Sequence, residues 1–364
     1  MRLTNNRKAF IALLRAGLWN QEIELKQFGR LDYDEILQQA EEQSVVGLVT
    51  AGLELVQDEK VPQTVLLQFI GSTLQVEQRN KEMNAFITKL FKKLKSEGVT
   101  AILVKGQGVA QSYEKPLWRA SGDVDLLLDA ANYEKAKNVL LPIAYDVEQE
   151  DVLKKHQALK IMGFEVELHG RMPFAVSRIA QQVNDEVVAD SLKNGGVSVW
   201  RVNETDVFNP NPNNHLYLVF THYLQHFFIE GVGLRQICDW CRMLWKHHNE
   251  LDLLLLESRL RQSGLMTEWQ VFGSLAVEYL GMPKEAMPFY DERYKKKALR
   301  TLKRVLKSGN FGHNNDLSYR TKYKGTTYKA VSLWRRFWDF VGMTTIFPID
   351  APKFFMVYIH GKMK

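Results

Sequence analysis

The sequence predicts an α+β protein in which a small mixed sheet and its helices lie between an N-terminal and a C-terminal helical region. Two patterns carry this prediction. Apolar residues recur at intervals of three and four through residues 1–95 and again beyond residue 209, which is typical of helices that bury one face. Between these regions, short apolar runs bounded by glycine, proline and asparagine indicate strands. The four expected regions are 1–95, 96–208, 209–310 and a basic and aromatic extension over 311–364.

Four helices are expected in the N-terminal region. The stretches with helical apolar spacing are 10–18, 34–39, 44–56 and 65–95. Thr4 or Asn5 can cap the first helix, Pro62 suits the start of the last, and Gly98 ends it. The long fourth helix should therefore lead directly into the first strand.

The stretch over residues 101–129 carries the residues that suggest chemistry. It opens as an apolar strand and then turns at Gly106 and Gly108, whose small size lets backbone N–H groups approach a phosphate. Lys105 beside the turn and Arg119 in the polar connection could neutralise charge as a phosphoryl group moves. The stretch ends in a second strand.

Asp123 and Asp125 lie at the start of this second strand. Side chains alternate along a strand, so both carboxylates share one face while Val124 and Leu126 occupy the other. Two adjacent carboxylates repel each other unless a cation or a shared proton offsets them. A hard divalent ion such as Mg²⁺ prefers such oxygen ligands and brings substrate phosphates with it. The alternative is that both residues are loop-exit residues on a solvated edge.

This arrangement of a glycine turn and a strand with a D-x-D pair resembles that of the nucleotidyltransferase superfamily with the DNA polymerase beta-like fold. More closely, the residues resemble a bacterial family of uncharacterised nucleotidyltransferases with the pattern K-G, then Y…P…R, then D-x-D-L-L, then E-L-H. The matching residues are Lys105-Gly106, Tyr113, Pro116, Arg119, Asp123-Val124-Asp125-Leu126-Leu127 and Glu167-Leu168-His169. The resemblance covers roughly residues 60–250. The superfamily usually places Ser or Gly after the turn glycine, where this chain has Gln107.

The resemblance implies metal-dependent transfer of a nucleoside monophosphate from a nucleoside triphosphate to a hydroxyl or phosphate acceptor. The implied metal ligands and catalytic residues, for Mg²⁺ or Mn²⁺, are Asp123, Asp125 and Glu167. The implied nucleotide-binding residues are Lys105, Gly106, Gln107, Gly108, Arg119, Ser121, Gly122 and His169. The acceptor could be anionic, for example a sugar phosphate. Two alternatives are a catalytically silent module that binds a nucleotide or glycan, and a membrane-peripheral scaffold.

The third carboxylate is expected on a strand over residues 159–169, with a bulge or turn at Gly163. Glu165, Glu167 and His169 share one face of this strand. Glu167 occupies the glutamate position of the E-L-H motif, and Glu165 replaces it if the register differs. Both glutamates could instead line the solvated face of an edge strand. His169 could contact phosphate, orient Glu167 or have a structural role.

The remaining elements of the α/β region are less informative. Helices are expected over 132–141 and 179–192, and strands over 144–147 and 197–202. We expect the strand over 197–202 to be the last of the sheet. The sequence N-P-N-P-N-N at 209–214 is strongly turn-forming and marks the expected domain boundary.

Helical spacing returns after this boundary. The predicted helices are 215–228, 234–247, 251–262 and 267–280. His222 and His226 are four residues apart, which suits a metal site, a polar wall facing the nucleotide or, most simply, a structural pair. Arg235 and Asp239 are expected from the family resemblance to face the cleft.

Cys238 and Cys241 form a C-x-x-C sequence within an apolar helix face. A zinc site needs two further ligands, which His247 and His248 would have to supply, so buried free thiols are the favoured interpretation. Two cysteines in 364 residues provide no disulfide framework and favour a reducing compartment.

The C-terminal part is basic and aromatic. Residues 293–307 are basic on most faces of a predicted helix, which favours a solvated helix over a docking surface for an anionic acceptor. An aromatic stripe beside Arg335 and Arg336 suits a membrane interface, but we expect it to dock onto the protein's own core. The stripe comprises Leu333, Trp334, Phe337, Trp338 and Val341.

The composition of the chain limits which partners and which cellular location we expect. The net charge of +6 and a pI near 9.0 suggest an anionic partner: nucleotide, nucleic acid, acidic glycan or membrane surface. The apolar N-terminal run is interrupted by Arg15, so it is not expected to be a signal peptide, and no run is long enough for a transmembrane helix. We therefore expect a cytoplasmic protein, with peripheral membrane association as an alternative.

Overall fold

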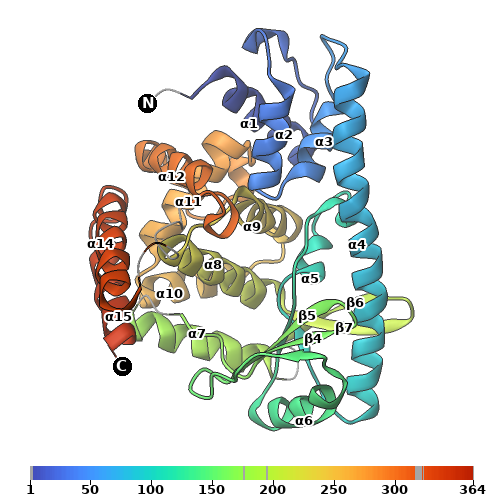
Figure 1. Cartoon of the computed structure of the whole chain (residues 1–364), viewed down its shortest axis with the longest axis vertical. Coiled ribbons are helices and arrows are strands. Elements are labelled where there is room, and N and C mark those ends of the chain that lie inside the picture. Colours follow the sequence, from blue (N-terminus) through green and yellow to red (C-terminus); the bar gives the residue numbers. More distant parts are fainter. Residues whose placement is uncertain (1–2, 175–176, 194–195, 316–321, 323, 364) are drawn as a thin grey trace.

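The computed structural model describes residues 3–174, 177–193, 196–315, 322 and 324–363. A seven-stranded mixed sheet lies at one end of the molecule, and helices from both ends of the chain form the rest (Figure 1). The long helix α4 (Gln63–Ser96) runs along one side and connects the N-terminal helices with the sheet (Figure 1). The predicted α+β class with flanking helical regions is confirmed.

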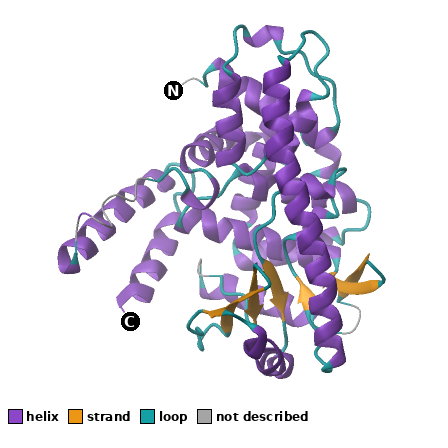
Figure 2. Ribbon diagram, turned by 45° about the vertical axis from the view of Figure 1, so that its right-hand side comes forward, coloured by secondary structure: helices purple, strands orange, loops and turns teal. Residues whose placement is uncertain are grey.

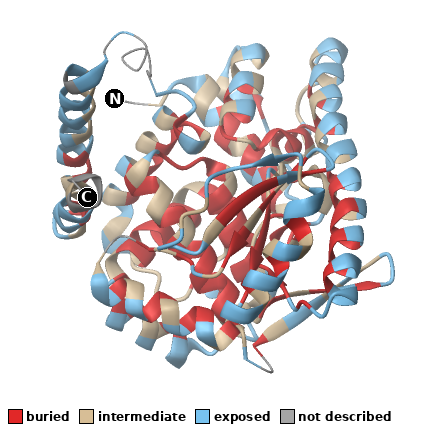
Figure 3. Ribbon diagram, turned by 60° about the horizontal axis from the view of Figure 1, so that its bottom comes forward, coloured by how far each residue is buried: buried red, intermediate tan, exposed pale blue. Residues whose placement is uncertain are grey.

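The sheet has the strand order β3-β4-β5-β2-β1-β7-β6. The bounds are β1 Ile102–Leu103, β2 Val124–Leu127, β3 Asp146–Val147, β4 His156–Ile161, β5 Phe164–His169, β6 Val197–Val202 and β7 Thr205–Pro210. The pairs β2–β5 and β1–β7 are parallel, and the other pairs are antiparallel. The central strands β1 and β2 are buried along their whole length (Figure 3).

Two expectations about the sheet were wrong. The stretch 159–169 has the expected turn at Gly163, but it is the hairpin β4–β5 and not one strand, because Met162 and Gly163 both adopt positive φ and form a two-residue turn. Strand β6 is not the last, since Asn203 and Glu204 form a second such turn that leads into β7. The first two residues of the segment 209–214 therefore end a strand that pairs with β1.

The N-terminal helices agree with their apolar spacing. Their bounds are α1 Asn5–Trp19, α2 Tyr33–Glu42 and α3 Val46–Leu53, followed by α4. Thr4 caps α1, since its hydroxyl accepts a hydrogen bond from the N–H of Arg7. Beyond α4, Gly98 adopts a φ of 67° and turns the chain toward β1.

Helices cover both faces of the sheet. The second half of α4 and α6 (Ala130–Leu140) pack on one face through Leu103, Leu126 and Leu128. On the other face, α7 (Arg178–Ser191) and α8 (Pro212–Ile229) belong to the same core as Ile102 and Leu127. Alternate residues of β1 and β2 thus point into different cores, as strand geometry requires.

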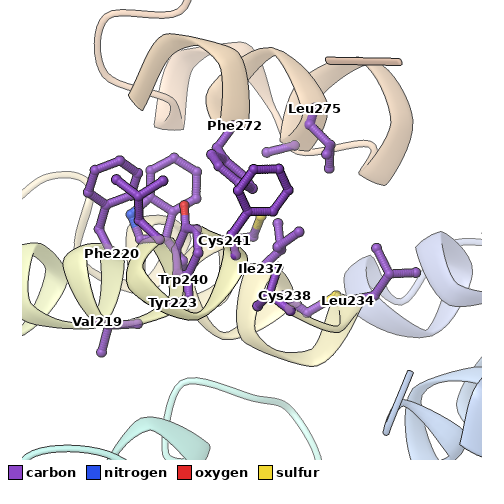
Figure 4. Close-up of a cluster of buried hydrophobic side chains, with 14 of the residues drawn as sticks. Val219, Phe220, Tyr223, Leu234, Ile237, Cys238, Trp240, Cys241, Phe272 and Leu275 are labelled. Atoms are coloured by element: carbon purple, nitrogen blue, oxygen red, sulfur yellow. The ribbon is translucent and has the colours of Figure 1, made fainter. Parts of the chain in front are cut away.

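The C-terminal helices form a large apolar core. Their bounds are α8 as above, α9 Leu234–His247, α10 Leu253–Ser263, α11 Met266–Leu280 and α12 Lys295–Ser308. Aromatic side chains of α8, α9 and α11 interlock at its centre, including Phe220, Trp240 and Phe272 (Figure 4). Cys238 and Cys241 are free thiols buried in this core, as predicted (Figure 4).

The last two helices form an arm that extends from the body. α14 (Gly325–Thr344) packs beside α15 (Asp350–Met363), and the pair projects outward (Figure 2). The expectation that the aromatic stripe docks onto the core was wrong: Trp334 and Trp338 are 62% and 53% exposed, and Phe340 and Met343 make the inward contacts instead. In the described part of the chain, no helix is long and apolar enough to cross a membrane.

Candidate functional site

Three carboxylates meet where β2 and β5 run parallel. Asp125 on β2 lies opposite Glu167 on β5, and Asp123 immediately precedes β2 on the same face. One oxygen from each carboxylate lies within 4.8 Å of the others. The parallel register therefore brings together Asp125 and Glu167, which are 42 positions apart in the sequence.

Neighbouring groups shift the pKa values of Asp123 and Glu167 in opposite directions. Repulsion from Asp125, together with burial, raises the pKa of Asp123. Burial also acts to raise the pKa of Glu167, but hydrogen bonds from His156 and His169 hold it well below its usual range. The Oδ2 atom of Asp125 is buried and makes no hydrogen bond. An unpartnered carboxylate oxygen inside a cluster of three carboxylates fits a divalent metal ligand.

Lys105 is the closest cation to the cluster. Its Nζ lies 2.5 Å from Oδ1 of Asp125 and 3.3 Å from Nε2 of His222 on α8. Burial acts to lower the pKa of Lys105, but the three carboxylates outweigh it and raise the pKa. Burial and the charge of Lys105 hold the pKa of His222 well below its usual value. The ammonium group of Lys105 can act only as a donor in this contact.

Two histidines cover the other side of the carboxylates. Nε2 of His169 lies 2.9 Å from Asp125 Oδ1 and 3.2 Å from Glu167 Oε2. These bonds overcome the effect of burial and raise the pKa of His169. His156 lies across the hairpin from His169, and its Nε2 is 3.4 Å from Glu167 Oε2. His169 was a sequence candidate, whereas the contribution of His156 depends on the β4–β5 hairpin.

The glycine turn is closely packed against the protein. Gly106 has a φ of 57°, and a Cβ on it would lie 3.1 Å from the carbonyl oxygen of Asp123. A Cβ on Gly108 would lie 2.1 Å from Oδ1 of Asn209 at the end of β7. Gly106 therefore borders the carboxylate cluster, whereas Gly108 permits contact between the turn and β7.

Gln107 points into the protein core. Its Nε2 donates to Oδ1 of Asn80 on α4 at 2.7 Å and to Oγ of Ser121 at 3.2 Å. Gln107 and Asn80 are each 1% exposed. The side chain of Gln107 thus links α4 to the segment before β2. Because this side chain is turned away, only the backbone of Gln107 can face the cleft. Gly122 precedes Asp123, and no heavy atom lies within 4 Å of the position that a Cβ on Gly122 would occupy.

Arg119 and Asp239 form a buried ion pair between the α/β region and α9. The guanidinium donates to both carboxylate oxygens at 2.9 and 2.6 Å, and the hydroxyl of Tyr113 also donates to Asp239 at 2.7 Å. Arg119 thus has a structural partner beside the cluster. Arg235 on the same helix lies closer to the opening, where its guanidinium donates to the carbonyl of Ala120 at 2.8 Å and its charge acts on Asp123.

Two cavities meet at the carboxylate cluster. An open cavity of about 460 Å³ and a small enclosed cavity of about 50 Å³ share Asp123, Arg235 and Phe311 as lining residues. Other residues of the open cavity include Arg79, Ser121, Gly122, Lys160, Glu165 and Asn310. Other residues of the enclosed cavity include Lys105, Gly106, Arg119, His222 and Asp239. Lys105 and Asp123 thus face a common cleft, with the α8–α9 region as its opposite wall.

Comparison with known protein families identifies one matching family. The model of a family described as uncharacterised nucleotidyltransferase matches residues 29–281, which is most of the chain. The chain belongs to this uncharacterised nucleotidyltransferase family. No curated protein and no solved structure shows a significant match. The matched range includes the three carboxylates, the glycine turn and α9.

The geometry distinguishes Glu165 from Glu167, the two candidates for the third carboxylate. Glu167 completes the carboxylate cluster, whereas Glu165 lies one pleat away and lines the open cavity. Burial and the charges of Glu167 and Asp123 raise the pKa of Glu165. Phe311, Arg79 and Lys160 were missed from the sequence because no motif connects them with residues 105–125. Only their shared cavity does so.

Proposed function

We propose that this chain is a metal-dependent nucleotidyltransferase that moves a nucleoside monophosphate from a nucleoside triphosphate to a hydroxyl or phosphate acceptor. The observation that carries the proposal is the cluster of Asp123, Asp125 and Glu167 beside Lys105 and Gly106. Bound Mg²⁺ or Mn²⁺ would neutralise phosphate charge and lower the pKa of an acceptor hydroxyl. The three carboxylates are the proposed ligands.

The chain's own residues have distinct proposed roles. Asp123 and Asp125 fix the position of the triphosphate, and Glu167 extends the site toward the acceptor. Lys105 moves from Asp125 to the phosphates, because a cation between the carboxylates would displace its ammonium group. Backbone N–H groups at Gly106 and Gly122 approach the phosphates, and Arg235 stabilises charge on the departing pyrophosphate.

The reaction is an in-line displacement at the α-phosphorus. The acceptor oxygen, whose proton passes to solvent when the acceptor is a hydroxyl, forms a new bond to the α-phosphorus. The bond from this phosphorus to the bridging oxygen breaks, and pyrophosphate leaves with that electron pair. The helical region after residue 209 provides one wall of the cleft through Arg235 and Phe311. We therefore assign to it the recognition of the base and part of the acceptor.

Calorimetry tests the donor site directly. Mg²⁺ and each of four nucleoside triphosphates are titrated into wild type, Asp123→Ala/Asp125→Ala and the control Asp206→Ala, which changes an exposed carboxylate. We expect metal-dependent binding in wild type and the control, and its loss in the double variant. Absence of binding to folded wild-type protein would overturn the proposal.

Turnover distinguishes an enzyme from a silent binding module. The buried side chain of Gln107, at the position where the superfamily usually has Ser or Gly, is the feature that favours a silent module. Pyrophosphate release is measured with each bound triphosphate and a panel of sugar phosphates, alcohols and proteins as acceptors. Release that depends on Mg²⁺ and on Asp125 supports transfer, whereas tight binding without release from any acceptor favours the silent module.

We also propose that the α14–α15 arm contacts an anionic membrane surface. Trp334 and Trp338, four residues apart on α14, are exposed, and so are Leu333 and Phe337 beside them. Such a row of exposed aromatic and aliphatic side chains is typical of an interfacial helix. Flotation with anionic and neutral vesicles at low salt compares wild type with Trp334→Ser/Trp338→Ser. We expect binding to anionic vesicles that the substitutions reduce. Wild type that stays off anionic vesicles would refute this role.

A further inference from the structure

Phe311 has an unusual combination of conformation and exposure. It adopts a φ of 49° and a ψ of 33° within the short 3-10 turn η6 (Asn310–Gly312), although it has a bulky side chain. This left-handed region is unfavourable for residues with a Cβ, and aromatic residues rarely occupy it. The residue is nevertheless 43% exposed, so burial of its ring does not explain the conformation.

Hydrogen bonds from two distant regions fix the segment that carries Phe311. Asn310 donates to Oγ of Ser44 before α3 at 2.8 Å and accepts from Nε2 of Gln236 on α9 at 2.6 Å. Asn315 donates to the carbonyl of Glu230 after α8 at 2.9 Å. The neighbours of the ring are thus anchored, which means that the exposed ring occupies a defined position.

The ring faces the cleft beside the carboxylate cluster. Phe311 is common to both cavities, and among the described residues that line the open cavity it is the only aromatic one. The guanidinium carbon of Arg235 lies 5.9 Å from the ring centroid, and the ring of His226 packs at 4.9 Å and 75°. Arg235 in turn acts on Asp123. A planar aromatic surface therefore adjoins the proposed phosphate site with one cation between them.

We propose that Phe311 is the stacking platform for the base of the donor nucleotide. This inference rests on the proposed nucleotidyl transfer, since it requires the triphosphate to lie at Asp123 and Arg235. A nucleotide anchored there by its phosphates presents its base at the end of the cleft that Phe311 occupies. An aromatic ring can stack on the π-face of any base. Because the backbone around Phe311 is already anchored, the segment does not have to become ordered when the nucleotide binds.

The position of Phe311 in the cleft is compatible with either a sugar or a base. The chemistry of its aromatic ring favours the base. The rest of the open cavity is polar, with the charged groups of Arg79, Lys160 and Glu165 available for the hydroxyl or phosphate groups of an acceptor. A single exposed phenylalanine beside a cation adds a flat apolar surface that matches a nucleobase. The platform therefore assigns one end of the cleft to the donor and leaves the charged part for the acceptor.

Binding of nucleotide and inorganic tripolyphosphate separates stacking from phosphate recognition. In the presence of Mg²⁺, calorimetry compares both probes with wild type, Phe311→Ala, Phe311→Tyr and Phe311→Gly; the nucleotide is whichever of the four triphosphates binds wild type. We expect Phe311→Ala to weaken nucleotide binding about tenfold or more and to leave tripolyphosphate binding unchanged. Phe311→Tyr retains the ring and should bind nucleotide within about twofold of wild type.

Phe311→Gly guards against a folding artefact. Glycine accepts the left-handed conformation, so this variant keeps the turn while it removes the ring, and it should weaken nucleotide binding as Phe311→Ala does. The matched control is Tyr145→Ala, which removes an exposed aromatic side chain outside both cavities and should not change binding.

The outcomes are distinguishable from failure of the proposed function. If wild type binds nucleotide and both ringless variants bind it equally well, or if they lose tripolyphosphate binding to the same extent, the stacking role is overturned and nucleotidyl transfer stands. If folded wild type binds no nucleoside triphosphate, the proposed function itself fails, and the stacking role fails with it.

Discussion

Individual charged residues around the cleft are buried with specific partners. The ion pair of Arg119 and Asp239 is the clearest example, since both side chains are 6% exposed and the carboxylate also accepts from Tyr113. Buried pairs of this kind cost desolvation energy, and the loss of one partner is more damaging than the pair is stabilising. Their role is to fix α9 against the segment that leads to Asp123.

Asp239→Ala should therefore destabilise the protein strongly. The substitution leaves the guanidinium of Arg119 buried without its carboxylate, which we expect to lower the free energy of unfolding by about 3–5 kcal/mol. Asp206→Ala breaks an exposed pair with Arg201 and should change it by less than about 0.5 kcal/mol. Urea denaturation measures both. Equal effects of the two substitutions would contradict the structural role of Asp239.

His215 should make stability depend on pH. Its Nε2 donates to the carbonyl of Val104 at 2.7 Å, and burial lowers its pKa to about 4 from an ordinary value near 6.5. Between these values the unfolded chain binds a proton that the folded protein does not, so stability falls as pH decreases from 6.5 to 4, by about 3 kcal/mol at most.

The control is His215→Gln, which retains a donor for Val104 and does not titrate. Chemical denaturation at pH 7, 6, 5 and 4 should give a smaller loss of stability for this variant than for wild type. Parallel curves for the two proteins would show that His215 does not contribute the expected proton linkage.

Asp123 illustrates a conflict between function and stability. Because repulsion from Asp125 and burial raise its pKa, the charged carboxylate is unfavourable in the metal-free protein. Asp123→Asn should raise the free energy of unfolding without metal by about 0.5–2 kcal/mol and abolish the thermal shift on adding Mg²⁺ with nucleotide. Differential scanning fluorimetry measures both effects. A destabilised variant that still responds to Mg²⁺ would contradict this account.

At the scale of elements, backbone geometry sets which residues meet. The parallel register of β2 and β5 places Asp125 opposite Glu167, and the two-residue turn at Met162 and Gly163 places His156 opposite His169. A shift of one residue in either pairing would move these side chains to the other face. The carboxylate cluster is therefore a property of the strand pairing as much as of the residues.

The crossing of α1 and α3 depends on two glycines. A Cβ on Gly52 would lie 2.0 Å from the carbonyl oxygen of Leu13, and one on Gly17 would lie 1.8 Å from that of Leu48. Since the obstacle is backbone, Gly52→Ala should force the helices apart and lower the free energy of unfolding by about 1–3 kcal/mol.

Gly71→Ala on α4 is the matched control for this crossing. No heavy atom lies within 4 Å of its Cβ position, so alanine should stabilise the helix by about 0.5–1 kcal/mol. Thermal unfolding of the two variants should give shifts of opposite sign. Two shifts of the same sign would show that helix propensity, not close packing, dominates at Gly52.

At the scale of the whole molecule, the site is assembled from distant parts of the chain. The sheet supplies the carboxylates, α8 and α9 supply His222 and Arg235, and the segment after α12 supplies Phe311. This arrangement joins the helical regions to the sheet around one cleft. The α14–α15 arm remains outside it, attached mainly through the inner faces of its helices.

The attachment of the arm should depend on Phe354 and not on its tryptophans. Phe354 is 1% exposed and stacks on Phe228 of α8 at 5.1 Å, so Phe354→Ala should lower the free energy of unfolding by about 3–5 kcal/mol. Trp334→Ser/Trp338→Ser should change it by about 1 kcal/mol or less, because both rings are largely exposed. Denaturant titration compares the two, and a larger loss from the tryptophan substitutions would contradict the outward orientation of the stripe.

The sequence alone determined the features that depend on local chemistry. Apolar spacing predicted the helices, including α9 with its observed bounds, because burial of one helix face leaves a periodic record in the sequence. The D-x-D pair followed from strand alternation, and the E-L-H motif indicated Glu167. The turn between β6 and β7 was missed because Asn203 and Glu204 carry a weaker turn signal than an Asn-Gly pair.

Only the tertiary structure decided which groups share the cleft and in what role. The side chain of Gln107 is turned into the core, and Arg119 is paired with a residue 120 positions away. Phe311 lines the same two cavities as Asp123 but comes from a segment with no recognisable motif. These outcomes depend on strand register, helix packing and buried charge pairing, which are relations between distant residues. The local sequence around any one of them does not contain that information, since each partner is chosen by the packing of the whole chain.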